Sequence, residues 1–212
     1  MQYKIKQFKD ELIDKACIKA MRDLNKFYEI NWKHNKPHII IVDDRKTIDS
    51  WRGEKTKRWV KAWVWCKSII FMLNRKNLDK ESSHTYNKER YLATVNHELS
   101  HLFFSVVSKN GYCPTWLKEG VSIYTSGQNK WKTKPEKFST FLSFDKKSGS
   151  GVYSESGFVV DILIKKFGKK KLLNLIKQSR DSKNGMDFKK LFFKIYKFNL
   201  NYRNINNLYN SN

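Results

Sequence analysis

The stretch His97-Glu98-Leu99-Ser100-His101 decides both the fold and the chemistry that this sequence predicts. Residues four apart lie on one face of an α-helix, so both imidazoles can reach a single tetrahedral metal ion. Glu98, next to the first imidazole, then points close to the open coordination position of that metal. The pattern therefore indicates metal-assisted hydrolysis.

Apolar residues recur at helical spacing around this stretch, which places it on a predicted helix. Asn87 is a suitable N-cap for that helix. At the other end, residues 109–111 read as a basic last turn that runs into a glycine C-cap at Gly111. We therefore expect the helix to end near Ser108.

A catalytic zinc site needs three protein ligands and an open position for water, so a third ligand must come from elsewhere in the chain. No histidine follows His101, and Cys113 is the only later cysteine, which makes a carboxylate the natural third ligand. Glu119 is the best candidate, since the chain can reverse after the first helix and return it to the metal. The alternative is a surface glutamate favoured by the dipole at a helix start.

The segment around Glu119 predicts a second helix. Thr115 can cap its start, and the first turn then presents Glu119 towards the metal. Gly120 removes a side chain where two helices would approach closely, and Gly127 can end the segment as a C-cap.

These residues resemble a known family. HELSH followed by Pro114-Thr115-Trp116-Leu117-Lys118-Glu119-Gly120 is similar to the gluzincin metallopeptidases, especially small peptidase-MA-like families with H-E-x-x-H and then P-x-W-x-x-E-G. The resemblance implies one zinc ion per chain, bound by His97, His101 and Glu119, with Glu98 as general base. It also implies an α+β, zincin-like fold: a small N-terminal mixed sheet with helices, an active-site helix, and a helical C-terminal lobe across a cleft. The expected lobes are residues 1–108 and 109–212 of a single catalytic domain.

The chain departs from relatives of this kind in two ways. Thermolysin-like members have an aspartate four residues after the ligand glutamate, which supports a histidine, whereas this chain has Ile123. That support must come from another residue. No glycine-rich exopeptidase motif precedes His97, which favours an endopeptidase acting on a peptide or protein substrate.

The resemblance also offers a donor for the oxyanion of the reaction. Tyr153 lies at about the position where similar gluzincins supply a tyrosine, so we assign it a catalytic role. A packing role for Tyr153 is the alternative, and Tyr112 and Tyr124 are then the substitutes.

The remaining sequence predicts helices around a small sheet. Before the HELSH helix we expect an amphipathic helix, a buried strand, a short helix, two strands with a turn at Lys67, and a polar loop that leaves His84 exposed. These elements cover residues 8–30, 38–42, 45–53, 59–73 and 74–86. A polar loop over residues 128–152 and three helices from Glu155 onward complete the chain.

Trp59 and Trp63 fall on one face of the predicted strands. The resemblance suggests that the edge of such a sheet pairs with an extended substrate by β-augmentation, so both rings could shape subsites. The alternative is that these large aromatics pack against a helix in the core.

Composition limits the partners of the chain less sharply. Lysine and arginine number 43 against 20 acidic residues, and the formal charge of +23 attracts anionic partners such as nucleic acid or acidic proteins. The alternative explanation for much of this excess is an AT-rich genome, since lysine and asparagine have AT-rich codons. The alternative function is a basic nucleic-acid-associated or interaction protein with a structural or inactive zinc site. Cys17, Cys66 and Cys113 predict free thiols, and the absence of a signal peptide or apolar span predicts a cytoplasmic protein of unknown oligomeric state.

Overall fold

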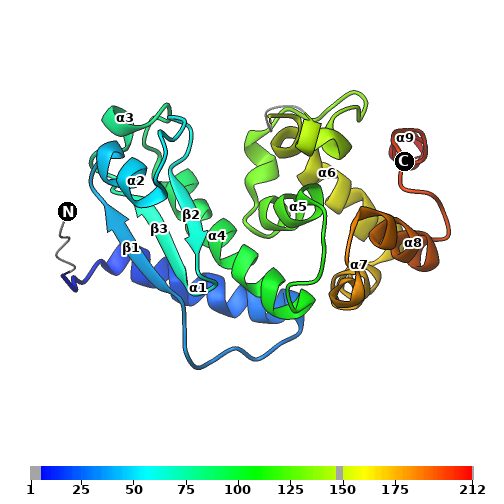
Figure 1. The fold of residues 1–212 in the computed structure, drawn as a ribbon, viewed down its shortest axis with the longest axis horizontal. Helices are drawn as coiled ribbons and strands as arrows, with labels where there is room; N and C mark the ends of the chain where they lie inside the picture. Colours follow the sequence, from blue (N-terminus) through cyan, green and yellow to red (C-terminus); the bar gives the residue numbers. More distant parts are fainter. Residues whose placement is uncertain (1–5, 147–149, 212) are drawn as a thin grey trace.

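The computed structural model describes residues 6–146 and 150–211, and these form helices around one small mixed sheet. The strand order is β1-β3-β2, in which β1 (His38–Val42) runs parallel to β3 (Ile69–Leu73) and β2 (Ala62–Trp65) runs antiparallel to it. The predicted α+β class is confirmed. Figure 1 shows the sheet on one side of the molecule and the C-terminal helices on the other.

The hairpin between β2 and β3 forms where the sequence predicts it. Residues 66–68 connect the paired Trp65 and Ile69, and Cys66 and Lys67 both have left-handed backbone angles, with φ of 47° and 62°, which matches the twist of the flanking strands. Residues 38–42 form the predicted strand, but the expectation that this strand is buried is wrong. β1 is an edge strand, and of its side chains only Val42 is fully buried.

Two long helices support the sheet. α1 (Glu11–Tyr28) begins after Asp10, whose carboxylate accepts the amides of the first turn, and packs against α4 (Lys88–Ser108), which also contacts β2. α2 (Arg45–Arg52) confirms the short helix predicted there. Residues 74–86 are not all loop, since α3 (Leu78–Glu81) forms one helical turn around the buried Leu78.

The C-terminal half contains one helix more than the sequence predicts. α5 (Thr115–Thr125) is followed by α6 (Ser150–Phe167), α7 (Lys169–Gln178), α8 (Gly185–Tyr196) and α9 (Tyr202–Asn210). α9 escapes a periodicity argument because it buries only Ile205, although Asn201 caps its start through the Asn204 amide. Single 3₁₀ turns η1 (Gln128–Trp131), η2 (Phe141–Lys146) and η3 (Ser179–Asp181) occupy the connections.

The helix ends around α4 and α5 differ from the predicted caps. Asn87 caps α4 as expected, but Lys109 takes the left-handed C-cap conformation and Gly111 does not. A side chain at Gly111 would meet the backbone of Ser179, which explains the glycine. α5 begins after Pro114 instead of being capped by Thr115, and Gly127 adopts φ of 69° one residue beyond its C-cap.

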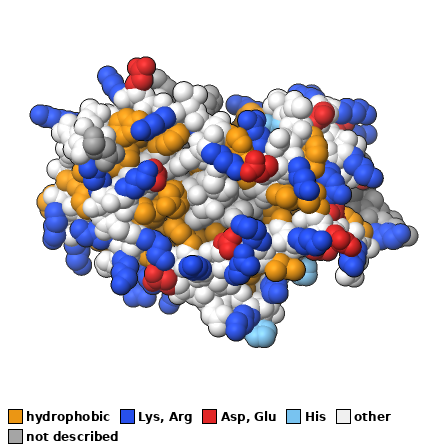
Figure 2. All heavy atoms as spheres, turned by 180° about the vertical axis from the view of Figure 1, so that it is seen from behind, with side chains coloured by type: hydrophobic (Ala, Val, Ile, Leu, Met, Phe, Trp, Pro, Cys, Tyr) orange, Lys and Arg blue, Asp and Glu red, His pale blue; other side chains and the backbone are white. Residues whose placement is uncertain are grey.

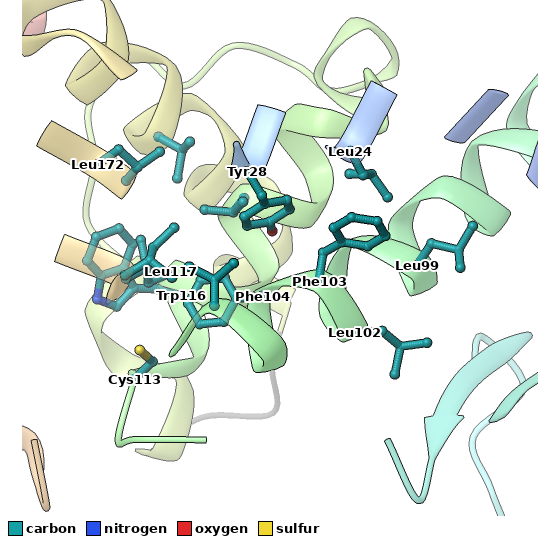
Figure 3. Close-up of a cluster of buried hydrophobic side chains, with 14 of the residues drawn as sticks. Leu24, Tyr28, Leu99, Leu102, Phe103, Phe104, Cys113, Trp116, Leu117 and Leu172 are labelled. Carbon is teal, nitrogen blue, oxygen red and sulfur yellow. The ribbon is translucent and has the colours of Figure 1, made fainter. Parts of the chain in front are cut away.

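A cluster of buried side chains holds α4 between α1, α5 and α7 (Figure 3). Phe103 stacks on Tyr28 of α1 with ring centroids 5.7 Å apart. The Tyr28 hydroxyl also donates to the backbone carbonyl of Ser100 at 3.2 Å. These contacts fix the rotation of α4, so one face of its central turns is directed away from the core. Since α4 joins elements on both sides, the predicted division at residue 108 stays a prediction.

Gly120 lies where α5 and α6 approach most closely, as predicted. A Cβ atom there would be 2.6 Å from the carbonyl oxygen of Ser156 and 2.8 Å from Cγ2 of Val160. Gly120→Ala should therefore lower the free energy of unfolding by about 1–3 kcal/mol, despite the better helix propensity of alanine. Urea denaturation measures the change, with exposed Lys118→Ala as the control. Unchanged or increased stability in Gly120→Ala would show that the helices are not so close.

None of the helices in the described part of the chain combines the length and the apolar character that a membrane crossing requires. Cys17, Cys66 and Cys113 are all free, as the sequence predicts.

Candidate metal centre

Three predicted ligands come together between α4 and α5. His97 and His101 lie one turn apart on α4, and their Nε2 atoms are 3.1 Å from each other. Glu119, in the second turn of α5, places Oε2 3.3 Å from Nε2 of His97 and Oε1 3.6 Å from Nε2 of His101. The group could hold a metal ion, and no other cluster of this kind occurs among the described residues.

The spacing of these atoms fits a tetrahedral ion. Ligand atoms bonded to zinc at about 2.0–2.2 Å in tetrahedral geometry lie roughly 3.3–3.6 Å from one another. The two imidazole nitrogens are 3.1 Å apart, one carboxylate oxygen of Glu119 is 3.3 Å from His97 and the other is 3.6 Å from His101, all close to that range. Oε2 of Glu119 is buried without a hydrogen-bond partner, which is costly unless a cation is bound there. The donor set of two imidazoles and one carboxylate therefore fits a divalent cation.

Ser122 supplies a second contact to His101. Its hydroxyl oxygen lies 3.2 Å from Nδ1 of His101, one helical turn after Glu119 on the same face of α5. A hydrogen bond at Nδ1 leaves Nε2 free to bind metal and fixes the ring orientation. This is the support that Ile123 cannot give, because Ile123 faces the core. The sequence carried no motif for it, although the i, i+3 spacing from Glu119 could have drawn attention to Ser122.

Ser122→Ala should weaken metal binding by roughly 10- to 100-fold without loss of the fold, since partners of ligating histidines typically contribute that much. Competition with a fluorescent zinc chelator measures the affinity. Ser126→Ala, one turn further along and outside the centre, is the control. Equal affinities in Ser122→Ala and wild type would show that the hydroxyl does not orient His101.

The protonation states of the three residues also favour a cation. Burial lowers the pKa of His101 to about 4, so its imidazole is neutral near pH 7. Burial alone would raise the pKa of Glu119, but the two histidines outweigh burial and lower it. Burial alone would lower the pKa of His97, but the Glu119 carboxylate outweighs burial and raises it. Metal binding at His97 therefore competes with protonation of its imidazole.

Glu98 lies beside the three residues, at the floor of a cleft of about 900 Å³ that they share. Its side chain is buried, and desolvation raises its pKa to about 7, with nearby Glu119 adding to the effect. A carboxylate with a pKa near neutrality can both accept and return a proton at physiological pH.

Of the three tyrosines considered for the oxyanion, only Tyr153 lines the cleft. It projects from α6, and burial followed by the negative charges of Glu119 and Glu98 raises its pKa, so the phenol stays protonated. Tyr124 instead packs against Phe27, and Tyr112 is exposed near the start of α5.

The opposite wall of the cleft comes from the sheet. Trp63 stacks on Phe71 with ring centroids 4.8 Å apart, and it also lines the cleft. Trp59 is 50% exposed, and its ring centroid lies 5.8 Å from that of Tyr153. Neither tryptophan therefore serves core packing alone, because both rings also line the cleft. The expectation that His84 is exposed is wrong: it is half-buried, and its Nε2 lies 2.8 Å from the carbonyl oxygen of Trp59.

Comparison of the chain with protein-family models, curated proteins and solved structures finds no match. The assignment of a function therefore depends on the chain's own residues.

Proposed function

We propose that this protein is a zinc-dependent metallopeptidase of the gluzincin type, with a zincin-like catalytic domain. The observation that carries the proposal is the convergence of His97, His101 and Glu119 at tetrahedral spacing, with a buried Glu98 beside them. Two imidazoles and one carboxylate, with a fourth position facing a cleft, is the ligand set of a catalytic zinc site. A structural site would instead be closed by a fourth protein ligand.

A zinc ion held by these three residues supplies Lewis acidity, which acidifies water and polarises the substrate carbonyl. Glu98 accepts a proton from the attacking water as the new C–O bond forms at the carbonyl carbon. It then donates that proton to the amide nitrogen as the C–N bond breaks, so the products are a carboxylic acid and an amine. The phenol of Tyr153, across the cleft on α6, donates a hydrogen bond to the oxyanion in the transition state.

The sheet supports an extended peptide as the substrate. β2 is an edge strand, and Ala62 to Val64 line the cleft. A peptide can add to such an edge by main-chain hydrogen bonds, which are independent of its sequence. We propose an endopeptidase, because no feature of the cleft among the described residues is dedicated to a free amino terminus.

Incubation of the zinc-loaded protein with a proteome-derived peptide library, followed by mass spectrometry of the new termini, tests the proposal. We expect internal cleavages that disappear when zinc is removed by a chelator and return when it is added back. A fully folded, zinc-loaded protein that cleaves no peptide would exclude the peptidase function.

The rate of peptide hydrolysis should decrease as the pH is lowered, with a midpoint at or below pH 7. Glu98 must be ionised to accept a proton, so the rate falls as pH drops through its pKa. Burial raises that pKa to about 7 without the metal, and a bound divalent cation would move it lower by favouring the carboxylate. A pH profile of kcat/KM measures the limb. Activity that rises steadily from pH 7 to pH 5 would contradict a general-base role for Glu98.

The alternative of a nucleic-acid-associated protein gains no specific support. Figure 2 shows basic side chains scattered over the face drawn, with acidic and hydrophobic side chains between them. A surface that tracks a phosphate backbone would gather them in a continuous stripe or groove on that face. Anionic partners outside the cleft therefore remain a prediction from charge alone.

A further inference from the structure

The walls of the cleft carry an excess of positive charge. Besides the two site carboxylates, Glu54 is the only acidic residue among the described residues that lines it, and it is paired with Arg52. Six basic residues line the same cleft: Arg52, Lys55, Lys57, Lys61, Arg90 and Lys132. An occupant of the cleft therefore meets a positive field that low-dielectric walls strengthen.

Two of these lysines interact electrostatically with the carboxylates of the candidate metal centre. Lys61 directly precedes β2 and interacts electrostatically with Glu98. Lys132 directly follows η1 and interacts with Glu119. Both ammonium groups therefore act within the same cleft as the carboxylates beside which a scissile bond would lie.

Neither lysine forms a close ion pair in the described part of the chain. Both side chains are half-buried, and desolvation lowers the pKa of each. Within residues 6–146 and 150–211, no carboxylate lies at ion-pair distance from either ammonium group. Partial burial of an unpaired cation is unfavourable, and a bound anionic group would relieve the cost.

Lys61 and Lys132 are not needed to balance the charges of the metal centre. One divalent cation bound beside the carboxylates of Glu98 and Glu119 would balance both of them, so the loaded centre would not need a lysine for charge balance. Lys61 and Lys132 then leave the cleft with a net positive charge. That excess is free to act on a substrate.

We propose that the cleft selects acidic peptides, with Lys61 and Lys132 as specificity-determining residues that bind carboxylate side chains flanking the cleaved bond. This inference rests on the proposed peptidase function for the identity of the cleaved bond. The binding preference itself can be measured without catalysis. It is therefore open to a test that is separate from hydrolysis.

The test uses zinc-loaded Glu98→Gln protein, in which bound peptides are not turned over, and fluorescence anisotropy. Two labelled peptides are compared that differ only in glutamate against glutamine at the positions flanking one bond. We expect the glutamate peptide to bind roughly tenfold more tightly at low salt, since charge pairs in a partly desolvated site contribute on that scale. The difference should shrink as ionic strength increases.

Lys61→Met and Lys132→Met, made in the same background, should each lower the glutamate-to-glutamine affinity ratio several-fold. Lys137→Met is the matched control, because Lys137 is exposed in the loop after η1 and lies outside the cleft. An equal loss in all three variants would overturn the proposal and assign the preference to the overall charge of +23. Equal affinity of the unsubstituted background for both peptides would also overturn it.

The two proposals fail in different ways. If wild type cleaves no peptide but the lysine variants lose acidic-peptide binding, the peptidase function fails and the acidic binding cleft stands. If wild type cleaves glutamate and glutamine peptides with equal kcat/KM, the peptidase function stands and the specificity fails.

Discussion

Glu98→Gln is expected to reduce peptide hydrolysis by about 10²–10⁴-fold while leaving the fold and the zinc content unchanged. Glutamine has the shape of glutamate but cannot accept the proton of the attacking water. Glu98 does not bind the metal in this arrangement, since the three ligand atoms come from His97, His101 and Glu119. The substitution also removes a buried carboxyl group, and desolvation raises the pKa of that group. Because its ionised form is unfavourable when buried, glutamine at this position should not destabilise the protein.

The measurement is kcat/KM on a peptide identified from the library, together with zinc content and thermal unfolding of the same preparation. Glu11→Gln is the matched control, because Glu11 is exposed in the first turn of α1 and does not line the cleft. Wild-type activity in Glu98→Gln would mean that Glu98 is only a spacer between ligands, and the proposed mechanism would then be wrong.

Glu119→Ala is expected to produce the largest loss of metal affinity. It removes one of three ligands, so the loss should exceed the 10- to 100-fold expected for Ser122→Ala. Added zinc should stabilise wild type by about 2.7 kcal/mol at a hundredfold excess over Kd, which corresponds to a rise in Tm of roughly 5–10 °C for a chain of this size. Glu119→Ala should lose most of that rise.

Thermal unfolding with and without zinc gives the comparison, and exposed Lys118→Ala is the control on the same helix. The difference between the two curves isolates metal binding from any direct effect of the substitution on the apo protein. If zinc raised the Tm of Glu119→Ala as much as that of wild type, the carboxylate would not be a ligand, and its contact with His97 would be an ordinary ion pair.

Local patterns predicted most of the elements because each pattern reports burial along one element. The periodicity around residues 91–106 gives α4, and the β-branched run before Asp43 gives β1. The same reasoning missed α9, because this helix is stabilised by its caps and buries only one isoleucine. It also predicted that β1 is buried, whereas β1 is a partly exposed edge strand, because strand order is set by tertiary pairing and a five-residue apolar run does not encode it.

The candidate metal-binding group was predictable because helical spacing fixes His97 and His101, and the lack of later histidines leaves a carboxylate as the candidate third ligand. Ser122, Lys61 and Lys132 were not predicted as parts of the site. Each reaches it from a segment whose position depends on how α5, η1 and β2 pack around α4. A serine or lysine in isolation carries no chemical signature, so its place in a site appears only in three dimensions.

X-ray absorption at the zinc edge of the zinc-loaded protein tests the central claim most directly, since it reports the atoms bound to the metal. The account predicts one zinc per chain, with two imidazole nitrogens and carboxylate or water oxygens at about 2.0–2.2 Å. Sulfur at about 2.3 Å would assign the metal to cysteines instead. Either that result or a protein that binds no zinc would contradict the metal centre formed by His97, His101 and Glu119.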